Sequence, residues 1–145
     1  MNKSFLLLLA ATVSTLVSCK KDEPAPPAPV TTTNVTATIN GAQQVQPTTS
    51  TATGAFSGTY NSTDSKLTYT VTYQGFTPTS AHIHLGIPGA NGPVAIPFAT
   101  LTSPITGSIT LTADQADKLL NNGMYVNMHS AQFSGGEIRG NIRKQ

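Results

Sequence analysis

Residues 66–74 read KLTYTVTYQ, and this stretch decides the fold class of the chain. The apolar residues from Leu67 to Tyr73 alternate with polar ones, so an extended strand has one apolar and one polar face. Threonine and tyrosine, which are enriched in strands, supply most of the stretch. It therefore predicts a β-strand with one face buried and the other in water.

The same alternation recurs more weakly along the rest of the chain. Glycine and proline interrupt it every eight to twelve residues, which is typical of an all-β sandwich or barrel. We therefore predict an all-β fold, a Greek-key antiparallel β-sandwich or barrel of about eight strands. The other strands are expected at residues 35–39, 54–60, 81–85, 94–98, 106–111, 124–129 and 137–142.

One short helix is expected before the penultimate strand. The Thr112 side chain can cap it while Gln115 reaches back to the cap, and Ala116 and Leu119 share an apolar stripe. Gly123 suits a left-handed residue at its end. The helix should be a two-turn connector.

The start of the chain has the pattern of an export signal. A basic beginning is followed by an apolar run from residue 5 to residue 17, which is too short for a stable membrane-spanning helix. The run ends in LVSC, which resembles the lipobox that is cut before its cysteine. We predict a signal peptide over residues 1–18 and a lipid on Cys19 that anchors the protein to a membrane.

A linker, residues 19–33, is expected between this anchor and the folded part. Its proline-rich segment, residues 24–29, favours extended chain. The preceding KKDE tract looks like the acidic tract that directs some Gram-negative lipoproteins to the outer face of the outer membrane. That likeness implies an outer-membrane lipoprotein facing the periplasm or the cell surface. The alternative is a solvated spacer whose charges do not determine the location of the protein.

Residues 34–145 form one candidate domain of ordinary size. Cys19 is the only cysteine, so the domain has no disulfide and depends on its core. Five basic and four acidic side chains give no electrostatic footprint for nucleic acid. No Gly-x-Ser-x-Gly turn offers a nucleophile and no carboxylates are paired, which favours a protein that is not an enzyme.

Two of the three histidines are one residue apart in SAHIHLG, residues 80–86. If the apolar residues of this strand point into the core, the pleat places His82 and His84 together on the opposite face. The same alternation in residues 124–129 turns His129 outward. If these strands are neighbours, the three imidazoles converge and suit one copper or zinc ion. The alternative is that they merely belong to the wet face of an antiparallel sheet.

Four further residues share this outward face: Tyr125, Asn127, Glu137 and Arg139. Tyr125, Asn127 and Glu137 can each orient a histidine through a hydrogen bond. The other interpretation is that they simply form the wet face of the sheet. Arg139 and Glu137, two residues apart, also suit an ordinary cross-strand pairing element of small energy.

Two long segments carry a family resemblance. SAHIHLGIPGANGPVAIPF, residues 80–98, and LTADQADKLLNNGMYVNMHSAQFSGGEIRGNI, residues 111–142, resemble the CHRD domain, named for chordin and common in secreted bacterial proteins. The likeness covers nearly all of residues 34–145. The chain departs from the family at residues 43–47, QQVQP, where an acidic residue and a Pro-Pro pair are usual.

A more distant likeness concerns the order of the histidines. His-x-His, a later strand ending in histidine and an arginine in the last strand are similar to the copper half of copper/zinc superoxide dismutase, a Greek-key β-barrel. This likeness implies His82, His84 and His129 as ligands and Arg139 as an anion-steering residue. The domain has no fourth histidine and no cysteine, which excludes a two-metal dismutase.

We therefore expect a lipid-anchored, non-catalytic CHRD binding module whose ligand is one copper or zinc ion. One alternative is a metal-free cell-surface module that binds an extracellular protein through Tyr125, Phe133 and the loop at residues 87–93. The other is a mononuclear copper redox enzyme that depends on Arg139 as well as the histidines.

Overall fold

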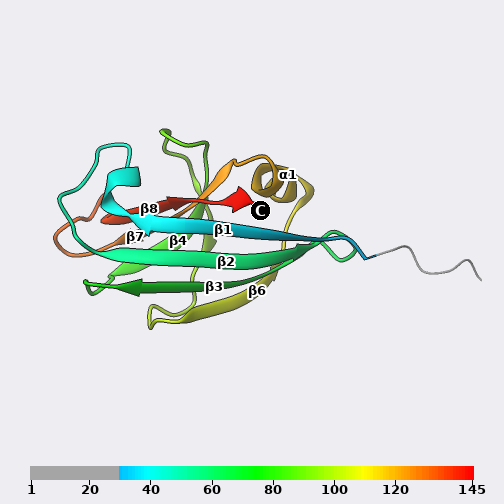
Figure 1. The fold of residues 1–145 in the computed structure, drawn as a ribbon, viewed down its shortest axis with the longest axis horizontal. Helices are drawn as coiled ribbons and strands as arrows, with labels where there is room; N and C mark the ends of the chain where they lie inside the picture. Colours follow the sequence, from blue (N-terminus) through cyan, green and yellow to red (C-terminus); the bar gives the residue numbers. More distant parts are fainter. Residues whose placement is uncertain (1–29) are drawn as a thin grey trace, which may run out of the picture.

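The computed structural model describes residues 30–145, and the predicted signal peptide, Cys19 and most of the linker lie outside them. Nearly all regular elements of the domain are strands (Figure 1). The elements of the described part are β1 (Thr32–Asn40), η1 (Gly41–Gln43), β2 (Thr53–Asn61), β3 (Lys66–Gln74), β4 (Ser80–Leu85), β5 (Val94–Pro97), β6 (Ile105–Thr110), α1 (Ala113–Leu120), β7 (Met124–His129), β8 (Ile138–Asn141) and β9 (Arg143–Lys144).

All strands belong to one antiparallel sheet that curls into a half-barrel. Its order is β5-β4-β7-β8-β1-β2-β3-β6, and β9 pairs with β1. β1, β2 and β3 pair in the order in which they follow one another in the sequence. By contrast, the antiparallel pairs β3–β6, β4–β7 and β8–β1 join strands that are separated in the sequence by other strands. Figure 1 shows β1, β2, β3 and β6 on one side, with β4 and β7 crossing behind them. The predicted all-β antiparallel class is confirmed.

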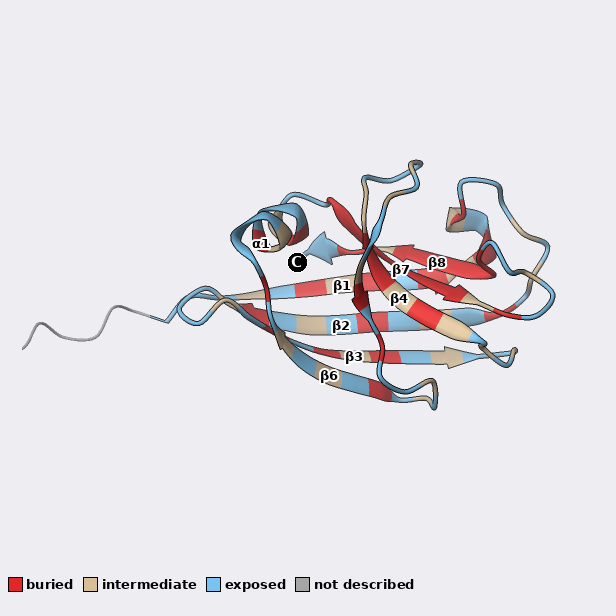
Figure 2. Ribbon diagram, turned by 180° about the vertical axis from the view of Figure 1, so that it is seen from behind, coloured by how far each residue is buried: buried red, intermediate tan, exposed pale blue. Residues whose placement is uncertain are grey.

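The core lies inside the curl and draws side chains from all strands except β9, together with α1. Along β3, the alternation read from the sequence is realised, because Leu67 and Val71 are fully buried while Thr68 and Thr72 are exposed. Burying one such aliphatic side chain contributes about 1.5–3 kcal/mol. Figure 2 shows the alternating pattern on β1, β2 and β3, and nearly continuous burial along β7 and β8.

Most predicted strand limits agree closely with the structure. β3 and β7 have the predicted bounds, and β1 begins three residues earlier than expected. The sequence did not predict β9, which contains only two residues and lacks a periodic signal. No helix among residues 30–145 has the length and apolar character needed to cross a membrane.

The helix confirms its predicted beginning and corrects its predicted end. The Gln115 N–H donates to Thr112 Oγ1 at 3.2 Å, and the Thr112 N–H donates to Gln115 Oε1 at 3.0 Å. The left-handed residue is Asn122, with φ of 58°, and not Gly123. The Gly123 N–H instead donates to Lys118 O at 2.7 Å, which closes a Schellman motif.

Candidate metal centre

The neighbouring strands β4 and β7 bring the three histidines together. In their register His82 lies opposite Asn127, His84 opposite Tyr125, and Ser80 opposite His129. The pleat puts all three imidazoles on the face away from the core, as predicted. One ring nitrogen of each histidine lies within 4.8 Å of the others. The ring centroid of His82 is 5.5 Å from that of His84 and 5.3 Å from that of His129.

Backbone carbonyls fix which nitrogen of two histidines carries the proton. His84 Nδ1 lies 2.9 Å from Gly92 O, and His129 Nδ1 lies 2.8 Å from Ser134 O. A carbonyl oxygen can only accept, so both Nδ1 atoms donate. In the neutral rings this leaves the Nε2 lone pairs free, the arrangement in which metal-binding histidines are oriented by backbone partners.

Three buried ring nitrogens have no hydrogen-bond partner among the described residues: His82 Nδ1, His84 Nε2 and His129 Nε2. Leaving a buried polar atom unpaired costs about 1–3 kcal/mol. Three such atoms in one cluster could together hold a metal ion.

The surroundings favour the neutral forms of His82 and His84. Burial lowers the pKa of His82, and the neighbouring His129 and His84 lower it further. Burial also lowers the pKa of His84 and outweighs the opposite effect of the Gly92 carbonyl, while His129 and Arg139 add to the lowering. A neutral imidazole is the form that binds a metal ion.

The donor set fits a borderline transition metal. All three candidate ligands are imidazoles, which suit copper and zinc, and a hard cation such as calcium prefers several oxygens. Metal–nitrogen bonds of about 2.0–2.1 Å place tetrahedral ligand atoms roughly 3.4 Å apart. Side-chain shifts of about 1 Å would bring the nitrogens, up to 4.8 Å apart, to this spacing. A fourth position would remain open.

Tyr125 shares the predicted face but is not exposed. Only 2 % of its surface is accessible, so its predicted place on a wet, protein-binding surface is wrong. Its ring stacks on His84 with centroids 4.8 Å apart and an interplanar angle of 7°. Its hydroxyl accepts a hydrogen bond from the Gly92 N–H at 3.2 Å. The loop at residues 86–93 covers it.

Arg139 is also buried, with no accessible surface. Nη2 donates to Ile87 O at 3.1 Å and to Ala90 O at 3.0 Å, and Nε donates to Asn141 Oδ1 at 3.2 Å. Its guanidinium carbon lies 3.5 Å from the centroid of the Tyr125 ring. These contacts direct the guanidinium at the covering loop, whereas anion steering requires donors that face solvent.

Asn127 and Glu137 hold a second covering loop, residues 41–52. Asn127 Oδ1 accepts from Gln44 Nε2 at 2.7 Å, and Glu137 Oε1 accepts from Ser50 Oγ at 2.6 Å. Both residues are buried, so the prediction that they form a wet face is wrong. The hydrogen bonds of both side chains fasten this loop.

A comparison with models of protein families gives a match to the domain. The model of the CHRD domain family matches residues 35–142, which is most of the chain. The chain belongs to the CHRD family. No curated protein gives a significant match to it. The CHRD resemblance read from the sequence is thereby confirmed, and the three histidines lie within the matched region.

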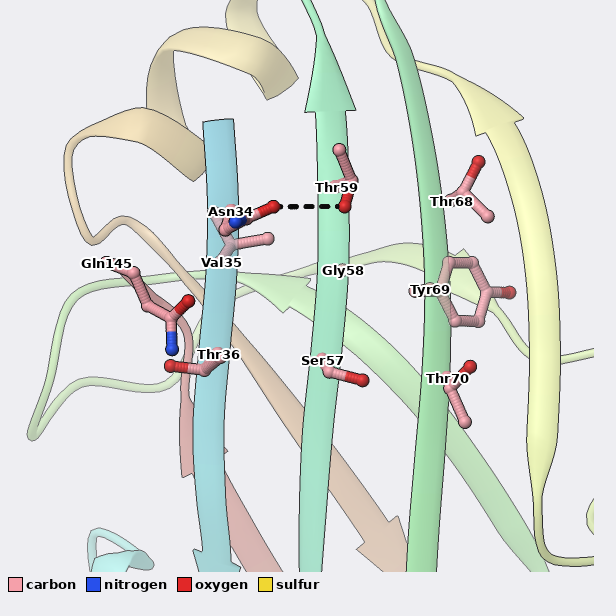
Figure 3. Close-up of a pocket in the computed structure, with 10 residues that line it drawn as sticks. All are labelled: Asn34, Val35, Thr36, Ser57, Gly58, Thr59, Thr68, Tyr69, Thr70 and Gln145. Atoms are coloured by element: carbon pink, nitrogen blue, oxygen red, sulfur yellow. Dashed lines mark hydrogen bonds between the residues drawn. The ribbon is translucent and has the colours of Figure 1, made fainter. Parts of the chain in front are cut away.

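A surface hollow of this CHRD domain lies away from the histidines, over β1, β2 and β3 (Figure 3). Hydroxyl groups dominate its side chains, and Thr59 Oγ1 donates to Asn34 Oδ1 at 3.1 Å. The residues that line the hollow include no histidine, cysteine, aspartate or glutamate. It therefore has none of the groups from which the histidine cluster is built.

Sequence reasoning missed four residues around the histidine cluster: Gly92 and Ser134, whose carbonyls accept from His84 and His129, and Gln43 and Gln44 in the loop at residues 41–52. Gly92 stood in the Asn-Gly-Pro turn, but a turn signal does not reveal which side chain its carbonyl meets. Gln43 Oε1 accepts from Asn141 Nδ2 at 3.1 Å, beside the Gln44–Asn127 bond. Gln43 and Gln44 thus fasten the loop at residues 41–52 to β7 and β8.

Proposed function

We propose that this CHRD domain is a non-catalytic module that binds one copper or zinc ion through His82, His84 and His129. The observation that carries the proposal is the cluster of three buried, unpartnered ring nitrogens. The lowered pKa of His82 and His84 supports it further, because both rings are available as neutral ligands at neutral pH.

The ligand atoms follow from the hydrogen bonds. His84 and His129 would bind through Nε2, because their Nδ1 atoms donate to Gly92 O and Ser134 O. His82 would bind through Nδ1, its buried atom without a partner. Three protein nitrogens leave room for water or another small ligand at the ion.

We further propose that a lipid on Cys19 anchors the domain to the outer membrane, on its periplasmic or surface side. The support is the apolar run ending in LVSC and the charged and proline-rich residues 20–29. An anchored metal-binding module would hold its ion close to the membrane surface.

A direct test is metal titration of tag-free protein after chelator treatment. We expect calorimetry to give one Cu²⁺ or Zn²⁺ per chain, and thermal unfolding to shift upward by mass action. Saturation at 100 times the Kd adds about 2.7 kcal/mol to the free energy of unfolding. His84→Ala should abolish both effects.

Thr68→Ala is the matched control, because it removes an exposed side chain from the half of the same sheet that has no histidine. It should bind the metal as the unaltered protein does. Metal binding that persists in the triple variant lacking all three histidines would contradict the proposal, as would the absence of stoichiometric binding in the unaltered protein.

A second candidate function is binding of an extracellular protein at the covering loops. Ile87 is 63 % exposed and Val45 is 41 % exposed, although both are large and apolar. A hollow beside Val45 is also lined by Asn91 and Phe133, which belong to the segments predicted to form an interaction surface. Partner binding that survives His84→Ala and fails on Val45→Ser would support this candidate.

A further inference from the structure

Arg139 is a cation that the fold buries completely against neutral groups. Its donors meet the carbonyl oxygens of Ile87 and Ala90 and the amide oxygen of Asn141. Burying a charge is costly unless hydrogen bonds compensate for the lost water. The compensation here comes mostly from one loop, residues 86–93, so Arg139 and this loop hold each other in place.

The same arginine belongs to a column of planar groups that ends at a candidate ligand. β7 lies between β4 and β8 in the sheet, so Tyr125 lies between His84 and Arg139. The guanidinium carbon is 3.5 Å from the Tyr125 centroid, and the Tyr125 and His84 centroids are 4.8 Å apart. A guanidinium over an aromatic face is attracted by the ring quadrupole. The stack therefore restricts the plane of the His84 ring.

Gly92 connects the loop to both rings. Its N–H donates to the Tyr125 hydroxyl, and its carbonyl accepts the proton of His84 Nδ1. A Cβ atom at this position would lie 1.6 Å from Leu85 O, so only glycine fits. Arg139 and Tyr125 hold the loop at residues 86–93 in position. The position of this loop in turn places the Gly92 carbonyl that sets the His84 tautomer.

We propose that Arg139 and Tyr125 are positioning residues that act through Gly92 to keep the proton of His84 on Nδ1 and its Nε2 atom free for a ligand. The tautomer part of this inference stands on hydrogen bonds alone. Its consequence for metal affinity rests on the proposed function.

The molecule contains its own reference for this inference. His129 Nδ1 donates to Ser134 O, which lies in a different loop from Gly92. The contacts of Arg139 and Tyr125 described above do not reach Ser134. A substitution that unseats the loop at residues 86–93 should therefore change His84 and leave His129 as it was.

The test is nitrogen-15 NMR of the histidine rings in metal-free protein, because ring nitrogen shifts distinguish the two tautomers. Arg139→Lys keeps the positive charge and loses the planar guanidinium that donates to several oxygens at once. Tyr125→Phe keeps the ring and loses the hydroxyl. Both should move the His84 signals toward a mixture of tautomers and leave those of His129 unchanged. Arg143→Lys, on an exposed residue, is the matched control and should change neither.

Metal titration of the same variants supplies the second measurement. Loss of a group that orients a ligand usually weakens metal binding tenfold to a hundredfold, and we expect Kd to rise by that factor in both variants. If Arg139→Lys does not fold, Tyr125→Phe decides the question. Unchanged His84 signals, or equal changes in His84 and His129, would overturn the inference.

The two proposals fail separately. If the unaltered protein binds no metal while the variants still shift the His84 tautomer, the metal proposal falls and the positioning role stands. If the unaltered protein binds metal and the variants bind it with the same Kd, the link from Arg139 and Tyr125 to affinity is wrong.

Discussion

The two halves of one sheet face differ more than their sequences suggest. On β1, β2, β3 and β6 the face away from the core bears threonine and serine, most of them exposed. On β4, β7 and β8 the same face bears histidine, tyrosine, asparagine and arginine beneath loops, and Tyr125, Asn127 and Arg139 are buried. Figure 2 shows this contrast between the banded strands and the continuously buried ones.

The difference shows what a covering loop does to a polar surface. An exposed threonine satisfies its hydroxyl with water, so the uncovered half needs no protein partners. In the covered half each polar atom must find a partner in the protein or in a ligand. Asn127 and Arg139 find theirs, whereas the three histidine nitrogens do not. The candidate site is therefore the part of the β4 and β7 face that the covering loops leave unsatisfied.

Displacing the loop at residues 86–93 should have the largest effect on the free energy of unfolding. Gly92→Ala places a Cβ 1.6 Å from Leu85 O, so the loop at residues 86–93 must shift. We expect a loss of about 3 kcal/mol or more in the free energy of unfolding, measured by urea denaturation. Gly135→Ala is the matched control, since a Cβ there meets nothing within 4 Å, and it should cost less than about 1 kcal/mol. Equal losses of stability in Gly92→Ala and Gly135→Ala would contradict the importance of the loop at residues 86–93.

Breaking one hydrogen bond in each half should have an intermediate effect. Gln44→Ala leaves Asn127 Oδ1 buried without its donor, and we expect a loss of about 1–3 kcal/mol. Thr59→Ala breaks the exposed bond to Asn34 shown in Figure 3, where water replaces the hydroxyl, and should cost less than about 1 kcal/mol. Urea midpoints measure both. If Thr59→Ala cost as much as Gln44→Ala, burial would not distinguish the halves.

A pH change should have the smallest effect and act only on the covered half. Burial lowers the pKa of His82 and His84 in the folded domain, so below about pH 6.5 the unfolded chain binds more protons. Stability should therefore fall as the pH falls from 7.5 to 5.5, by less than the loss expected for Gln44→Ala. Denaturation of metal-free protein measures this.

The double variant His82→Asn, His84→Asn is the reference for that measurement. Its stability should depend less on pH over the same interval, because the two groups with lowered pKa are gone. An equal pH dependence in both proteins would show that other groups cause it.

Local pattern was enough to predict which side of each strand a residue occupies. Alternation in residues 124–129 places Tyr125, Asn127 and His129 together, and the structure agrees. The capping box at Thr112 and Gln115 was equally local and was confirmed. Such features depend on neighbours within a few residues, which a single sequence displays directly.

Burial of those same residues could not be predicted this way. Tyr125 and Arg139 are buried because a loop that their hydrogen bonds reach across 33 and 52 residues folds over them. Asn127 is buried because Gln44, 83 residues away, reaches it. Nothing periodic marks such contacts, and the turn residues of the loop at residues 87–93 indicate only that the chain bends. The sequence therefore predicted the candidate ligands and missed the residues that hold them.

The first strand, β1, pairs with β8 near the end of the domain, with Asn40 opposite Arg139. The sheet that carries the histidines is thus joined across strands from both ends of the described domain, and we expect it to form late during folding. An ion that stabilises this site would favour chains that have been completed over those that end early. Occupancy would then report the integrity of the whole domain.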